Sequence, residues 1–197
     1  MEVTEWMKGV SAMKIKSFLC ALVLTVCLLP AALCAAEITD EDMALGGIHI
    51  GDTIWEVQQR YGEGEHVADG VYIDGEDTVG ICAYDYGRSL IVEYRKDPDV
   101  YRVTSVHLGV NDVNKYILMP TEDARRIETP RGTHLDSTAE DLAEAYGYLP
   151  KPKCSHNAPP VCGYFYDGET AQLAFYICAE HSPGIRSIWL HAKKKHR

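Results

Sequence analysis

Hydrophobic and polar positions follow two different periods between residues 46 and 192. In two short segments, apolar residues recur at spacings of three and four, which is typical of one buried stripe along an amphipathic helix. The stripes are Ile54, Val57 and Tyr61 in the first segment and Ala139, Leu142 and Tyr146 in the second. Each segment is followed by short runs in which apolar residues come at every second position, as in half-buried strands.

Both predicted helices have matching start and stop signals. A threonine precedes each apolar stripe and an acidic residue follows three positions later, which is the capping-box pattern. A glycine, which closes a final helical turn without a Cβ clash, ends each segment. These residues are Thr53, Glu56 and Gly62 in the first copy and Thr138, Asp141 and Gly147 in the second. The pattern predicts helices near residues 53 to 61 and 138 to 146.

The strand pattern assigns side chains to two faces of a sheet. The residues expected to face the helices are Leu90, Val92, Tyr94, Val106, Leu108, Leu173, Phe175, Ile177, Ile188 and Leu190. The residues expected on the opposite face are Ile91, Glu93, Ser105, His107, Ala174, Tyr176, Ser187 and Trp189. Tyr84, Tyr86, Tyr164 and Tyr166 also alternate, so they are expected to share a single face.

The two helical segments are copies of one motif. Residues 47 to 62 and 132 to 147 are identical at five of sixteen positions, and the strand patterns after them correspond as well. A repeat of this length indicates duplicated structural units. We therefore expect an α+β fold of two tandem units, each one helix packed on about three antiparallel strands. The expected divisions are unit 1 at 37–118, a connector at 119–131, unit 2 at 132–192 and a basic tail at 193–197.

The paired glycine-to-Tyr-Gly segments and the strands after them resemble a known arrangement. Tandem helix-plus-sheet units occur in the β-lactamase inhibitory protein family, and a single unit occurs in the small lipoprotein of the outer-membrane barrel-assembly machinery. Residues 129 to 147 are also similar to a TPRG…T…YG segment of uncharacterised exported bacterial proteins. The resemblance covers most of residues 46 to 190, through short motifs. The inhibitor family implies a non-catalytic protein that grips another protein with a concave sheet face.

The N-terminus predicts export. Lys14 and Lys16 precede an apolar run over residues 18 to 33, and Ala35 and Ala36 are small residues suited to signal peptidase. Residues 1–36 therefore form an N-terminal extension with a signal peptide, and the mature chain is expected to be secreted or held in the periplasm or cell envelope. An uncleaved membrane anchor is the alternative, because the apolar stretch approaches spanning length. A membrane contact is expected only in that case.

The net charge of the chain indicates which class of partner it does not bind. The chain carries a formal charge of −10, which argues against a nucleic-acid partner. The basic tail is expected to be a solvated end or, alternatively, a contact for an acidic envelope polymer.

Outside the leader the cysteines are Cys82, Cys154, Cys162 and Cys178. An even number in an exported protein favours disulfides, at least one of them involving Cys154, and three pairings are open.

No familiar catalytic signature occurs in the chain. A phosphate-binding glycine loop, a GxSxG elbow and an HExxH helix are all missing from the sequence. His49 and His134 recur at equivalent positions, which favours packing beside the helix start over catalysis. Cys82 and His107 could form a thiol–imidazole pair, but a disulfide or buried thiol is the favoured interpretation. We expect no catalytic, metal-binding or cofactor-binding residue.

The candidate working surface is the sheet face that carries His107, Tyr176, Trp189 and Glu93. Aromatic residues left partly exposed are typical anchors of protein contacts. The sequence therefore favours an exported, non-enzymatic binding or inhibitory module with an unknown protein partner, for which the cell envelope is one location. The alternative is an assembly or structural accessory protein of the envelope, and a weaker one is a hydrolase with an unrecognised site.

Overall fold

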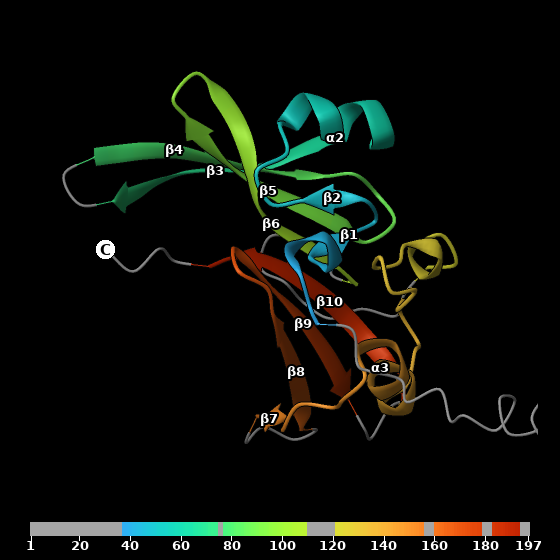
Figure 1. Cartoon of the computed structure of the whole chain (residues 1–197). Coiled ribbons are helices and arrows are strands. Elements are labelled where there is room, and N and C mark those ends of the chain that lie inside the picture. The colour runs from blue at the N-terminus through green and yellow to red at the C-terminus, as the bar shows by residue number, and fades with distance from the viewer. Residues whose placement is uncertain (1–36, 75–76, 110–120, 156–159, 179–182, 194–197) are drawn as a thin grey trace, which may run out of the picture. The chain divides into compact units, whose positions relative to one another are not determined.

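A computed structural model describes residues 37–74, 77–109, 121–155, 160–178 and 183–193, so the expected leader and most of the basic tail lie outside the described residues. Strands dominate these ranges (Figure 1). In chain order the elements are η1 (Asp40–Asp42), β1 (Ala44–Leu45), β2 (Ile48–His49), α2 (Ile54–Tyr61), β3 (Glu65–Asp74), β4 (Asp77–Asp85), β5 (Leu90–Asp97), β6 (Val100–Leu108), η2 (Ala124–Arg126), α3 (Ala139–Tyr146), β7 (Lys153–Cys154), β8 (Val161–Asp167), β9 (Ala171–Cys178) and β10 (Ile185–Ala192). None of the helices among them has the length and apolar character needed to cross a bilayer.

One antiparallel sheet of eight strands organises the protein, in the order β3-β4-β5-β6-β10-β9-β8-β7. β1 and β2 form a separate two-stranded sheet. The predicted fold class, two tandem units of one helix on about three strands, is therefore wrong. The strands that follow both helices belong to one sheet, and within the described residues four strands rather than three follow each helix.

The physical reason is the pairing of β6 with β10. These are the last strands of the two sequence copies, and they align Trp189 with His107 and Leu190 with Val106. Each strand would otherwise present an unpaired row of backbone N–H and C=O groups at the edge of its own sheet. Pairing satisfies both rows at once and merges the strands of the two copies into one sheet.

The two predicted helices are confirmed. Thr53 and Thr138 are the N-caps, and each makes a complete capping box with the acidic residue three positions later. Gly147 ends α3 in the left-handed conformation, with φ 76°. Gly62 ends α2 at φ 90° and ψ −174°, which is also a region open to glycine. Local capping chemistry is therefore enough to fix where both helices begin and end.

A single core fills the space between the helices and one face of the sheet, which we call the inner face. Val57 of α2 and Leu142 and Tyr146 of α3 supply the helical contribution. Every sheet residue predicted to face the helices lies in this core. These residues are Leu90, Val92, Tyr94, Val106, Leu108, Leu173, Phe175, Ile177, Ile188 and Leu190. The four alternating tyrosines also pack here. They lie on the face opposite Trp189 and Tyr176, so they do not extend the candidate contact surface.

Candidate protein-contact face

The side of the sheet away from the core carries the four predicted contact residues, and we call it the outer face. Strand register brings them together from both halves of the chain. His107 lies between Ile91 of β5 and Trp189 of β10, and Tyr176 pairs with Ser187 one step further along β10. Glu93 of β5 pairs with Ser105, the neighbour of His107 on the same face of β6. Because successive side chains of a strand alternate between faces, these residues project to the same side.

Five rings form a continuous group across the outer face, and we call them the aromatic cluster. They are Phe165, Tyr176, Trp189, His107 and His191. The ring centroids of Tyr176 and Trp189 are 4.9 Å apart, and those of His107 and Trp189 are 4.8 Å apart in an edge-to-face arrangement. Such geometry adds about 0.5–1.5 kcal/mol per pair beyond area burial. The cluster therefore holds its rings in defined positions.

The rings differ in how much solvent they reach. Phe165, Tyr176, Trp189 and His191 are partly exposed, whereas His107 is fully buried. Burial also raises the pKa of the Tyr176 hydroxyl above its ordinary value, so the phenol stays protonated at neutral pH. His107 therefore supports the cluster from below, and the other four rings are the ones that can touch a partner.

A polar group lies beside the rings. The Ser105 hydroxyl is 2.6 Å from Nδ1 of His191 and 2.9 Å from Nε2 of His107. Glu93 Oε1 lies 3.6 Å from the same Nε2 of His107. Because a hydroxyl carries one proton, Ser105 can donate to at most one imidazole and must accept from the other. This arrangement fixes the orientation of both rings.

Ser105, His107 and Glu93 have the residue types of a hydrolase triad but are not arranged as one. In a triad the serine and the acid contact opposite nitrogens of the histidine, so that the acid orients the ring that takes the serine proton. Here Ser105 and Glu93 both approach Nε2 of His107. Ser105 is also only 4% exposed. The geometry therefore favours a structural role for Ser105.

The two histidines that recur in the sequence copies do not lie on the outer face. His49 lies beside Asp52, with 3.8 Å between Nδ1 and the carboxylate, and His134 Nδ1 lies 2.6 Å from the carbonyl oxygen of Leu135. Within the described ranges no group of three or more His, Cys, Asp or Glu side chains is arranged to hold a metal ion. A surface hollow of about 530 Å³ includes Arg88, Arg126, Asp123 and Glu128 in its lining, and none of the predicted contact residues borders it.

Sequence reasoning missed two members of the aromatic cluster, Phe165 and His191. The signal for both is present in the alternation of the strands. Phe165 stands between two tyrosines that face the core, so its ring must face outward. His191 comes two positions after Trp189 and shares its face. In the repeat Phe165 corresponds to Asp85, which is not aromatic, and His191 lies just after the matched segment that ends at Leu190, so the repeat drew attention to neither.

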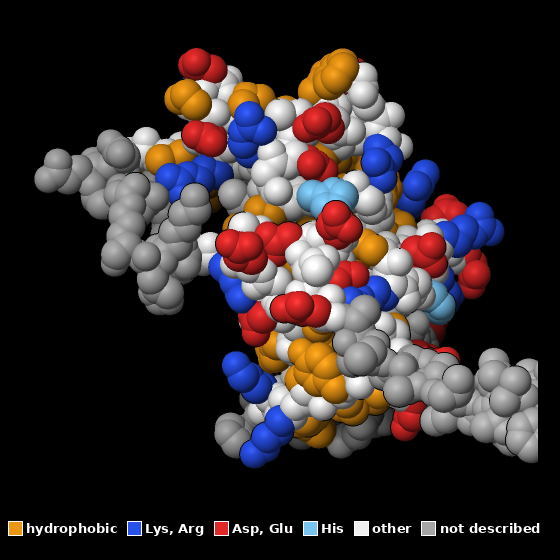
Figure 2. Space-filling view, viewed as in Figure 1, with side chains coloured by type: hydrophobic (Ala, Val, Ile, Leu, Met, Phe, Trp, Pro, Cys, Tyr) orange, Lys and Arg blue, Asp and Glu red, His pale blue; other side chains and the backbone are white. Residues whose placement is uncertain are grey.

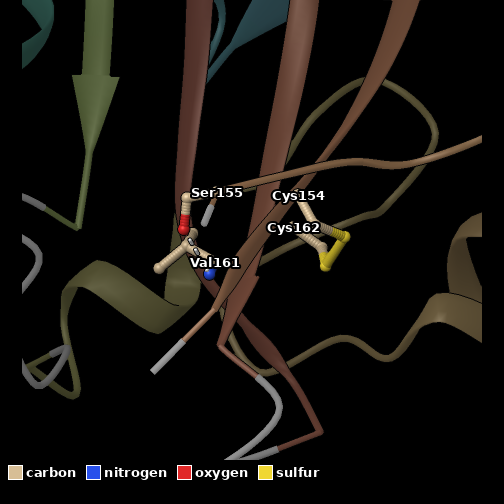
Figure 3. Close-up of a disulfide and its surroundings, with 4 residues drawn as sticks. All are labelled: Cys154, Ser155, Val161 and Cys162. Carbon is tan, nitrogen blue, oxygen red and sulfur yellow. Dashed lines mark hydrogen bonds between the residues drawn. A yellow bond between two sulfur atoms is a disulfide. The ribbon is translucent and has the colours of Figure 1, made fainter. Parts of the chain in front are cut away.

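The candidate cysteines separate into one bonded pair and two thiols. Cys154 and Cys162 are direct partners on neighbouring strands β7 and β8, and their sulfurs are bonded (Figure 3). The next residue, Ser155, accepts a hydrogen bond from the backbone N–H of Val161 at 3.0 Å (Figure 3). The expected disulfide involving Cys154 is thus present among the described residues, and it agrees with just one of the three open pairings, the one that joins Cys154 to Cys162. Cys82 and Cys178 are buried and lie outside this disulfide.

We expect non-reduced peptide mapping of the mature chain to find one Cys154–Cys162 disulfide and two thiols. Replacing both bonded cysteines with serine should lower the free energy of unfolding by about 2–3 kcal/mol, as loop-closure entropy gives for so short a loop.

Burial, helped by the charge of Asp69, raises the pKa of Cys82 to about 11. Cys82 should therefore resist alkylation in the native state at pH 7 and react after unfolding. Rapid native alkylation of Cys82, or mapping that finds a Cys82–Cys178 bond, would contradict this assignment.

Comparison of the chain with protein-family models, with curated proteins and with solved structures gives no match.

Proposed function

We propose that this protein is an exported, non-enzymatic binding module that contacts a protein partner through the outer face of its sheet. The observation that carries the proposal is the aromatic cluster, in which Phe165, Tyr176 and Trp189 remain partly exposed on three neighbouring strands. Tryptophan and tyrosine are enriched among residues that dominate binding energy at protein interfaces. An inhibitory module is one form that such a protein takes.

The cluster is suited to contact because it is held rigidly before a partner arrives. Trp189 packs against the small apolar group of Ala83 and Ile91 on the same face. The Lys153 ammonium group lies 4.9 Å from the centre of the Phe165 ring. Rings that are already ordered lose little side-chain entropy on binding. A partner can then bury apolar ring surface while Lys153 and Glu93 supply opposite charges toward the two ends of the patch.

Two observations support export, which is part of this proposal. The N-terminal sequence has the order of charges, apolar residues and small residues of a signal peptide. The Cys154–Cys162 disulfide is compatible with an oxidising compartment. Cell fractionation tests the location: we expect the mature chain outside the cytoplasm, and recovery of a full-length chain in the cytoplasm would contradict export.

The contact role is tested by affinity capture from an envelope extract of the organism that encodes the chain. We expect Tyr176→Ala to weaken capture of the retained protein by about 2 kcal/mol, which is roughly thirtyfold in the dissociation constant. Trp55→Ala is the matched control, because Trp55 is 63% exposed on α2 and lies away from the outer face. Loss of capture with Trp55→Ala alone would place the working surface on the helical side.

Trp189→Ala is the second variant and needs its own stability measurement. Because Trp189 packs against Ile91 and Ala83, its removal should also lower the free energy of unfolding. Capture is therefore compared well below the unfolding temperature, with circular dichroism to confirm folding. Tyr176→Ala and Trp189→Ala should weaken capture together. Intact capture by both folded variants would overturn the proposed contact face.

A further inference from the structure

The two edges of the eight-stranded sheet are built very differently. β7 forms one edge and is only two residues long, with Pro150 and Pro152 before it and a disulfide joining it to β8. β3 forms the other edge and runs for ten residues. Short strands and prolines are common means of blocking unwanted strand pairing. The β7 edge is therefore closed to an added strand, whereas β3 is long and contains no proline. Its pairing with β4 shifts register between His66 and Ala68, so the regular part of this edge begins at Ala68.

β3 presents a long open row of backbone groups. Among the described residues, β4 is the sole strand paired with it, and no other backbone hydrogen bond in those ranges reaches residues 65–74. The β3–β4 hairpin also extends beyond the neighbouring strands (Figure 1). Half of the N–H and C=O groups of an edge strand point away from its partner, so they are available to an extended chain.

The side chains along this hairpin offer apolar contacts to such a chain. Val67 and Val71 of β3 are 37% and 69% exposed, and Ile81 of β4 is 36% exposed. Gly70, which pairs with Ile81, has no side chain of its own, and the Ile81 side chain lies against it. In strand addition, main-chain hydrogen bonds supply affinity and the alternating side chains supply specificity. The β3 edge has both elements.

The charges of the β3 side chains determine which kind of strand can pair favourably with this edge. β3 contains Glu65, Asp69 and Asp74 and no lysine, arginine or proline, and the Asp69 side chain is 74% exposed. The Asp69 carboxylate lies 3.0 Å from Nε2 of His66, so the only nearby basic group on the strand is an imidazole. A second copy of β3 would bring acid beside acid in a chain of formal charge −10. A strand with basic side chains would gain attraction instead.

We propose that the β3 edge binds an extended, lysine- or arginine-containing segment of a partner protein by β-strand addition. This surface is separate from the aromatic cluster, so it is a second contact that the proposed function does not require. Figure 2 shows acidic side chains over the middle of the face in view and basic ones toward its margins, where the β3–β4 hairpin lies, so the preference for a basic segment rests on the acidic residues of β3 itself.

The test uses the mature chain and three short, capped peptides. The first alternates lysine and valine, the second replaces lysine with glutamate, and the third keeps lysine but carries an N-methyl group on every backbone amide, so that neither edge of the peptide can donate hydrogen bonds. We expect the lysine peptide to slow hydrogen exchange of the β3 amides that do not bond to β4 by about tenfold or more at saturation. The glutamate and N-methylated peptides should give no such protection.

Charge reversal at the strand supplies the matched comparison. Asp69→Lys should weaken binding of the lysine peptide by about five- to tenfold, because an exposed attraction becomes a repulsion. Glu169→Lys makes the same change at the turn after β8 and should leave binding unchanged. Lack of β3 protection, equal protection by the N-methylated peptide, or concentration-dependent dimers that protect β3 without peptide would each overturn the proposal. None of these outcomes alters the tests of Tyr176 and Trp189.

Discussion

Replacing Tyr146 with alanine should lower the free energy of unfolding by about 4 kcal/mol, among the largest losses expected for a single substitution here. Tyr146 is fully buried and its ring stacks on Tyr166 with 4.2 Å between centroids. The Phe175 ring lies 5.7 Å away, and the Arg131 guanidinium lies 5.1 Å from the centre of the Tyr146 ring. Alanine would leave a cavity where α3 meets the sheet.

Two further variants show why Tyr146→Ala lowers the free energy of unfolding. Tyr146→Phe removes only the hydroxyl, which donates to Thr129 at 3.3 Å, and should cost about 1 kcal/mol. Tyr61 is the equivalent residue of the first copy but is only partly buried, so Tyr61→Ala should cost less than Tyr146→Ala. Denaturant unfolding of the three variants decides the order. A Tyr146→Ala loss below that of Tyr61→Ala would contradict the described packing of α3.

Replacing Asp42 with alanine should lower the free energy of unfolding by about 3 kcal/mol, because Arg131 would lose its carboxylate partner in a largely buried position. Nε and Nη2 of Arg131 each donate to one carboxylate oxygen of Asp42 at 2.8 Å. The two side chains are 16% and 13% exposed. Arg131 also donates to the carbonyl oxygens of Ala145 and Glu37. The pair therefore ties η1 to the end of α3.

An exposed ion pair provides the control. Arg126 and Asp123 are 80% and 65% exposed and lie 3.7 Å apart. Because exposed pairs contribute about 0–1 kcal/mol, Asp123→Ala should change the free energy of unfolding by no more than that. Equal losses for Asp42→Ala and Asp123→Ala, measured by denaturant unfolding under one set of conditions, would show that burial does not strengthen the Asp42–Arg131 pair.

The same pair predicts how stability depends on pH. Hydrogen bonds from Arg131 hold the pKa of Asp42 below its ordinary value of 3.8. A carboxyl group with a lowered folded-state pKa contributes stability above the unfolded-state pKa and loses it as pH falls through the folded-state pKa. Wild type should therefore lose more stability than Asp42→Ala between about pH 4 and strongly acid solution. Parallel acid profiles for the two proteins would contradict this linkage.

The sequence is sufficient to place the helices because their signals are local. Each capping box uses residues three positions apart, and each terminal glycine follows directly. The arrangement of the strands is different, because it depends on β6 and β10, which are about eighty residues apart in the chain. Nothing in either strand alone distinguishes an edge of one sheet from the centre of a larger one. The repeat therefore suggested two units where pairing makes one sheet.

The candidate site shows the same division between local and distant information. Alternation within strands is enough to assign Glu93, His107, Tyr176 and Trp189 to one side of their own strands. Their proximity across the sheet requires the β6–β10 register. The complete burial of His107 also depends on neighbours that its own strand does not reveal. Side-chain direction is thus predictable from sequence, whereas contact and exposure are not.

Site-specific photo-crosslinking in the native cell envelope tests the proposed contact face most directly. A photoreactive residue is placed at position 176 on the outer face or at position 55 on α2, and adducts are compared after illumination. The outer-face account predicts a discrete protein adduct from position 176 and none from position 55. An adduct from position 55 alone, or no adduct from either position in a chain that still folds and reaches the envelope, would contradict it.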